Sequence, residues 1–129
     1  MKTSQITRNI KVIVNVRYIG ERKHLNELVH YFNYDISIEN RGEDAVQLLK
    51  RHWLIKDTLR EDTVVDGEGV VGEMPVLRPN EFFQYTSGSY IYGGIGSMEG
   101  YYSFINTDTN EIFHVRIPLF NLIIPNIFN

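Results

Sequence analysis

The sequence contains no cysteine. Disulfide bonds, thiolate metal sites and cysteine nucleophiles are therefore excluded. This absence fits a reducing compartment, and we expect a cytoplasmic protein. The chain also lacks any apolar run near the roughly 18 to 20 residues that a membrane span needs, and its first residues lack the apolar stretch of a signal peptide. We therefore predict a protein that is not exported and has no membrane partner.

A surplus of positive charge is missing as well, because the formal net charge is −3. Attraction to phosphate backbones needs many clustered lysines and arginines, so nucleic acid is not an expected partner. The histidines show no His-x-x-His or His-Glu-x-x-His spacing. The sequence therefore nominates no metal ligands and implies no cofactor.

The composition predicts one globular domain over residues 1–129. Hydrophobic residues make up 43% of the chain and charged residues 22%, which is typical of a folded protein and unlike a disordered one. A chain of 129 residues is close to the commonest domain size and buries a sizeable core.

Alternation with a period of two residues is the dominant pattern. Apolar residues share one face of residues 10–18 and again of residues 32–38, which predicts two half-buried strands. The second strand is expected to stop at the turn formed by Asn40, Arg41 and Gly42. Residues 21–30 place Leu25, Leu28 and Val29 at helical spacing, but this segment is too short for its periodicity to distinguish a helical turn from a loop. We expect a long connection there.

The rest of the chain predicts several more strands. Residues 46–55 are rich in β-branched, aromatic and aliphatic residues and read as a central strand, with Trp53 between two sheets. Further strands are expected at residues 63–65, 70–71, 82–86, 101–106 and 112–117. Gly93, Gly94 and Gly96 are expected in one long loop, residues 107–110 in a tight turn, and Ser87 and Ser97 at strand ends. The pattern predicts an all-β antiparallel sandwich of about seven or eight strands.

Several motifs occur in a fixed order along the chain. They are Val46-Gln47-Leu48-Leu49-Lys50-Arg51-His52-Trp53, Gly67-Glu68-Gly69-Val70-Val71-Gly72-Glu73, Leu77-Arg78-Pro79, Phe83-Gln84-Tyr85-Thr86-Ser87-Gly88, Gly96-Ser97-Met98-Glu99-Gly100-Tyr101-Tyr102 and Ile117-Pro118-Leu119-Phe120. Their co-occurrence from about Thr7 to the end resembles the ApaG family, and ordered motifs are far more specific than any one alone.

The resemblance implies an immunoglobulin-like or fibronectin type III-like sandwich. Bacterial members of the family are encoded beside a diadenosine tetraphosphate hydrolase and are linked to cobalt and magnesium resistance or efflux. Eukaryotic relatives carry the domain fused to an F-box or within a polymerase-delta-interacting protein, which implies protein recognition. Where the family usually has Thr-Pro, this chain has Gly93-Gly94, so we expect a less rigid loop.

The segment from Gly67 to Gly72 matches the pattern Gly-x-Gly-x-x-Gly, whose glycines let backbone N–H groups approach a pyrophosphate. A dinucleotide fold would need a helix after Gly72, but Pro75 and Pro79 follow instead. We favour a glycine turn or bulge between two strands. The alternative is a cradle for pyrophosphate or a nucleotide, which the resemblance also suggests and which the charges of Glu68 and Glu73 oppose unless a divalent cation bridges them.

Arg51, His52 and Trp53 follow one another in the expected central strand. Alternation places Arg51 and Trp53 on one face and His52 on the other. We expect Trp53 in the core. Arg51 is either an anion ligand or, as we favour, a charge paired across the sheet, and His52 is equally a rim residue or a ligand.

Acidic residues crowd the segment from residue 57 to 73, and an apolar sequence ends the chain. The acidic residues fit no EF-hand spacing, so we interpret them as a solvated surface rather than as a magnesium site. The apolar C-terminal residues are expected to dock on their own sandwich as a final strand or extension, with a homodimer or partner contact as the alternative. They are Leu119, Phe120, Leu122, Ile123, Ile124, Ile127 and Phe128.

No nucleophile elbow or other catalytic pattern is present, so we expect a protein without enzymatic activity. The leading hypothesis is a module that binds another protein. The alternative is a binder of pyrophosphate-containing nucleotides, with or without Mg²⁺, through Gly67, Gly69 and Gly72 with help from Arg51 and His52. A third hypothesis, an accessory role in cobalt or magnesium homeostasis, rests on the resemblance alone.

Overall fold

A computed structural model describes residues 1–125, which form nine strands and no helix. The strands are β1 (Lys2–Thr7), β2 (Ile10–His24), β3 (Glu27–Asn40), β4 (Val46–Asp57), β5 (Thr63–Glu68), β6 (Val76–Leu77), β7 (Phe82–Ile91), β8 (Ile95–Asn106) and β9 (Ile112–Ile123). No helix in the described part of the chain is long and apolar enough to cross a membrane.

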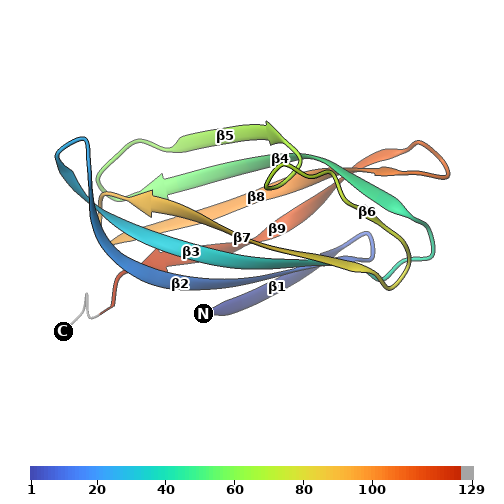
Figure 1. Ribbon diagram of the computed structural model, residues 1–129, viewed down its shortest axis with the longest axis horizontal. Helices are drawn as coiled ribbons and strands as arrows, with labels where there is room; N and C mark the ends of the chain where they lie inside the picture. The colour runs from blue at the N-terminus through green and yellow to red at the C-terminus, as the bar shows by residue number, and fades with distance from the viewer. Residues whose placement is uncertain (126–129) are drawn as a thin grey trace.

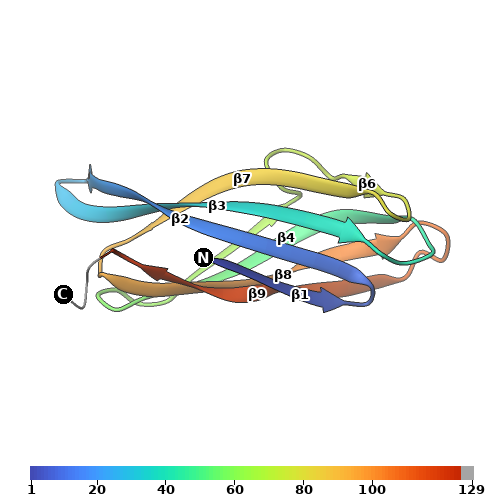
Figure 2. The same ribbon diagram turned by 90° about the horizontal axis from the view of Figure 1, so that it is seen from below.

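The strands form two antiparallel sheets that pack face to face (Figures 1 and 2). Sheet A has the order β1-β2-β3-β7, and sheet B has the order β5-β4-β8-β9, with β6 pairing with β4 beyond β5. On one side of the sandwich β1 lies against β9, and the Arg116 N–H donates a hydrogen bond to the Thr7 hydroxyl at 3.2 Å. On the opposite side both sheets end, at β5 and at β7. This confirms the predicted β-sandwich, with nine strands in place of seven or eight.

The core lies between the sheets because alternate residues of each strand point inward. Trp53 on β4 packs against Tyr34 of sheet A, with ring centroids 5.5 Å apart, and against Phe120 of its own sheet, at 5.9 Å. The predictions of a central strand at residues 46–55 and of Trp53 between the sheets are both confirmed. Phe120 and Leu122 of β9 are also buried in this core, so the C-terminal strand seals its own sandwich. Ile127 and Phe128 lie outside the described residues.

Four local expectations are wrong. Residues 21–30 form no long connection, since β2 and β3 continue to a turn at Leu25 and Asn26, which have φ of 50° and 66°. Such positive values suit a two-residue hairpin turn and are common for asparagine, but leucine rarely adopts them, so the pair Leu25-Asn26 is a weak turn signal. Residues 70–71 form no strand, Gly96 lies within β8, and Ser87 and Ser97 lie inside strands. The turn at residues 40–42 and the one at 107–110 are confirmed.

Candidate functional site

The glycine segment is a tight turn after β5. Val70 and Glu73 exchange two backbone hydrogen bonds, of 2.8 and 2.9 Å, around a turn made by Val71 and Gly72. Gly69 and Gly72 have φ of 61° and 81°, which glycine adopts without steric cost. The chain then runs through Pro75 into β6, and no helix begins at Gly72. The segment therefore has the geometry of a glycine turn, as we favoured from the sequence, and not the strand-to-helix geometry of a dinucleotide site.

Arg51 lies across this segment. Its Nη1 donates hydrogen bonds to the carbonyl oxygens of Glu68 and Gly69, both at 2.9 Å. A Cβ atom at Gly67, the residue paired with Arg51, would lie 2.6 Å from the guanidinium carbon, so glycine is needed for the arginine to take this position.

The backbone N–H groups of the segment are largely occupied. The Gly69 N–H donates to the Leu49 carbonyl at 2.8 Å, and those of Val70 and Glu73 close the turn. A pyrophosphate cradle needs several N–H groups aimed at the ligand, whereas here the carbonyls of Glu68 and Gly69 face Arg51. Binding of pyrophosphate at Gly67, Gly69 and Gly72 stays a prediction, and this geometry does not favour it.

Behind Arg51, a cleft of about 320 Å³ opens between the sheets. Tyr34 of β3 and Tyr85 and Ser87 of β7 line its sheet A wall, and Arg51 and Trp53 line its sheet B wall. Burial raises the pKa of the Tyr34 hydroxyl, against the lowering effects of the Ser87 hydroxyl and the charge of Arg51. Burial likewise raises the pKa of Tyr85. These hydroxyls are therefore neutral near pH 7 and keep their hydrogens for donation.

His52 faces the opposite side of sheet B, as alternation predicts. Its Nδ1 is 2.6 Å from a carboxylate oxygen of Asp66, the residue paired with it on β5. Its ring stacks on Tyr101 of β8, with centroids 4.7 Å apart, and Tyr101 stacks on His114 of β9, at 4.4 Å. These three rings, called here the His52–Tyr101–His114 stack, cross three strands on the outer face of sheet B. The side chains of Arg51 and His52 thus lie on opposite faces of β4, although both residues border a hollow of about 290 Å³ that Gly67 also lines.

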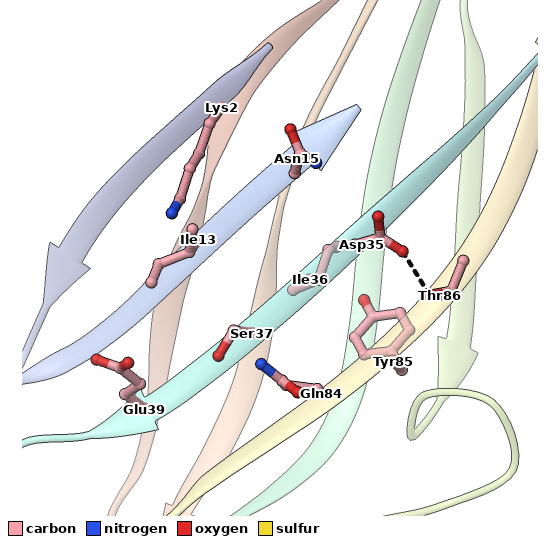
Figure 3. A pocket seen from close by; sticks show the side chains of 10 residues that line it. All are labelled: Lys2, Ile13, Asn15, Asp35, Ile36, Ser37, Glu39, Gln84, Tyr85 and Thr86. Carbon is pink, nitrogen blue, oxygen red and sulfur yellow. Dashed lines mark hydrogen bonds between the residues drawn. The ribbon is translucent and has the colours of Figure 1, made fainter. Parts of the chain in front are cut away.

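A second concave surface lies on the outer face of sheet A and has a volume of about 640 Å³ (Figure 3). Asp35 lies in it and accepts two hydrogen bonds from the Arg17 guanidinium, at 3.1 and 3.2 Å, and one from the Thr86 hydroxyl, at 2.5 Å. The Thr86 hydrogen bond, followed by the contacts with Arg17, lowers the pKa of Asp35. The Asp35 carboxylate is therefore already paired within the protein.

The acidic residues between positions 57 and 73 do not converge. The Asp57 carboxylate accepts hydrogen bonds from the backbone N–H groups of Leu59, Tyr92 and Gly93, at 3.0, 2.7 and 2.9 Å, which ties the loop of residues 92–94 to β4. Within residues 1–125, no group of three or more His, Asp or Glu side chains could hold a metal ion. Whether Gly93-Gly94 makes this loop less rigid stays a prediction.

Comparison with known proteins identifies the family. The family model described as the ApaG domain matches residues 20–106. The chain belongs to the ApaG family. It is 42% identical to Protein ApaG from Afipia carboxidovorans, covering 95% of this chain and 93% of that one, and 38% identical to Protein ApaG from Shewanella halifaxensis, covering 98% and 99%. The crystal structure of an ApaA-designated protein from Bordetella pertussis superposes with a TM-score of 0.82 at 36% identity, covering 91% and 94%.

The name Protein ApaG states no catalytic activity for these relatives. Within this ApaG domain, the sequence motifs identified Arg51 and His52 but missed the tyrosines around them. Tyr85 and Tyr101 stand inside two of the motifs, yet their neighbours across the sheets come from distant strands. Alternation along β7 and β8 could have assigned Tyr85 to the inner face and Tyr101 to the outer face. It could not have shown that Tyr85 lies near Arg51 and Tyr101 near His52.

Proposed function

We propose that this ApaG protein is a non-catalytic binding module that docks another protein on the outer face of sheet B. The observation that carries the proposal is the His52–Tyr101–His114 stack. Each ring in it is held by its neighbour, and Asp66 fixes His52 by a hydrogen bond. A rigid aromatic group loses little conformational entropy on binding, which is why aromatic residues dominate the centres of protein interfaces.

The surroundings of the stack support the same function. At one end of the face, Val76, Gln47, Ile105 and Ile112 are directly paired across β6, β4, β8 and β9 and form a row. Val76 is 50% exposed and Ile112 is 62% exposed, so the row offers apolar contact area beside the stack. Lys50, Glu68 and Arg116, which carry charges of both signs, flank the His52–Tyr101–His114 stack. An aromatic and apolar centre with a mixed polar rim is the usual composition of a protein interface.

The non-catalytic part of the proposal is supported by the hydrogen bonds of the histidines. In residues 1–125, the recorded side-chain partners of histidine are the hydroxyls of Tyr18 and Tyr90 and the carboxylate of Asp66. No serine or threonine hydroxyl is hydrogen-bonded to a histidine in that range, so no nucleophile there is paired with a histidine base.

Quantitative affinity capture from the native cell tests the docking face. We expect Tyr101→Ala to lose the partner that the wild-type protein captures, and Phe82→Ala, which removes a 60% exposed aromatic ring from sheet A, to keep it. Equal loss or equal retention by both variants would contradict docking at the stack. Hydrolysis of nucleotides or dinucleoside polyphosphates by the purified protein, abolished by Arg51→Ala, would overturn the non-catalytic part.

The nucleotide alternative is tested separately by calorimetric titration with ATP, GTP and pyrophosphate, with and without Mg²⁺. The observation that supports the nucleotide alternative is the position of Arg51 beside Gly67. Absence of heat at about 1 mM ligand removes it, because a binding free energy near −4 kcal/mol already corresponds to a millimolar dissociation constant. The hypothesis of a role in cobalt or magnesium homeostasis has no corresponding group of ligands among residues 1–125.

A further inference from the structure

The two sheets of the sandwich are joined on one side and separate on the other. The contact between β1 and β9 closes the first side, whereas β5 and β7 are the free edges of sheets B and A on the second (Figure 1). The cleft of about 320 Å³ opens between these two edges. It is distinct from the outer face of sheet B, since its walls are the inward-facing residues of both sheets.

Arg51 supplies the cleft with a positive charge that has no acidic partner. No aspartate or glutamate lines the cleft, and none forms an ion pair with Arg51 in residues 1–125. The Nη1 of Arg51 is bonded to two backbone carbonyls, while its Nε–H and Nη2–H groups have no acceptor in the same range. A half-buried guanidinium with unused donors beside an open cleft favours an anion, because charges removed from water are normally paired.

Tyr85 adds a second donor. Its hydroxyl is hydrogen-bonded to that of Tyr102, which is 0% exposed. If Tyr85 donated this bond, the hydrogen of the Tyr102 hydroxyl would be buried without an acceptor, at a considerable cost. Tyr102 therefore donates to Tyr85, and the hydrogen of the Tyr85 hydroxyl is left to point into the cleft. The hydroxyl of Ser87 lines the same wall.

The rest of the sheet B wall is apolar. Trp53, Ile55 and Met98 line the cleft from sheet B. Its volume is at the lower end of the roughly 300–1,000 Å³ of ligand pockets, which suits a molecule the size of one substituted ring. We infer that this cleft binds a small organic anion, with its carboxylate or phosphate group on Arg51 and Tyr85 and its apolar body against Trp53. Neither the protein-docking face nor the N–H groups of the glycine turn takes part.

Nuclear magnetic resonance tests this inference directly, because Trp53 is the only tryptophan and gives a single indole N–H signal. The probes are benzoate, phenyl phosphate and the neutral benzamide, each added up to about 10 mM, which detects dissociation constants in the millimolar range. We expect benzoate, phenyl phosphate or both to shift the Trp53 signal in a saturable manner, and benzamide to leave it in place. The two anions distinguish a carboxylate ligand from a phosphate ligand.

Matched variants connect the binding to the named donors. Arg51→Gln is expected to weaken binding of the anion at least about tenfold and Tyr85→Phe severalfold, with Arg51→Lys intermediate. Arg22→Gln, which removes an exposed arginine near the end of β2, should leave binding unchanged. If Arg51→Gln does not fold, Tyr85→Phe and Arg51→Lys still decide the matter. An unmoved Trp53 signal with all probes, equal shifts with benzamide, or equal weakening by Arg22→Gln would each overturn the inference.

Discussion

Replacing Gly67 by alanine should destabilise the protein through Arg51. The added Cβ would lie 2.6 Å from the guanidinium carbon and from Nη2, which is closer than real contacts allow. The nearest atoms belong to the far end of a flexible side chain, so Arg51 is expected to move rather than the backbone of β5. Its two hydrogen bonds to the carbonyls of Glu68 and Gly69 would then be lost.

The size of the effect follows from those two bonds. Hydrogen bonds of charged groups contribute about 1.5–3 kcal/mol each when buried, and the contact with Glu68 is exposed, so we expect a total loss of about 1–3 kcal/mol. For a chain of 129 residues this corresponds to a fall in Tm of about 4 °C per kcal/mol. Urea denaturation followed by the fluorescence of Trp53 measures the free energy of unfolding, and an unchanged m-value confirms that the comparison is valid.

A double-mutant cycle tests the cause. In a protein that already carries Arg51→Ala, the alanine at position 67 meets no guanidinium, and its cost should fall to about zero. Gly72→Ala is the control, since no atom lies within 4 Å of its added Cβ and only the φ of 81° opposes it, so its cost of about 1 kcal/mol should be the same in both backgrounds. If Gly67→Ala is equally destabilising with and without Arg51, the assigned contact is wrong.

Three further predictions concern the core and the outer face of sheet A. Tyr85→Phe should lower the free energy of unfolding by about 1–3 kcal/mol, because it leaves the buried hydroxyl of Tyr102 without a partner. Tyr102→Phe should lower it less, because the Tyr85 hydroxyl still reaches the cleft. Equal losses for the two variants in thermal unfolding would contradict the assignment of Tyr102 as the donor. Because the pKa of Asp35 is lowered by folding, its contribution to stability is present above its unfolded pKa of about 3.9 and is lost as pH falls through the folded value. Thr86→Val removes the hydrogen bond that contributes most to this lowered pKa, so it should reduce the loss of stability in acid. An unchanged dependence of the free energy of unfolding on pH would refute this role of Thr86. Phe120→Ala should cost about 3–5 kcal/mol in denaturant titration, since Phe120 is 2% exposed, and a change below about 1 kcal/mol would show that β9 does not seal the core.

Much of the fold could be predicted because alternation is a local property of one strand. Residues that alternate along β2 and β3 show their inner face without reference to any partner, and the same holds for Trp53 on β4. The hairpin at Leu25 could not be predicted, because the pairing of β2 with β3 forces a leucine into a backbone conformation that its side chain disfavours. Glycine is common in loops, so the sequence favours a loop at Gly96. An added Cβ at Gly96 would lie 2.4 Å from the Lys56 carbonyl oxygen, however, so the close pairing of β8 with β4 requires a glycine inside a strand.

The sequence alone determined which residues face inward: it placed Arg51 and Trp53 on one side of β4 and His52 on the other, and it excluded a dinucleotide fold through the prolines after Gly72. Only the tertiary structure decided what those residues meet. The glycine turn directs its carbonyls at Arg51, and the partners of Tyr85 and Tyr101 come from strands distant in the chain. The reason is that a contact between strands depends on register, which turns and the bulges beside Leu48 and Met98 set over the whole sheet.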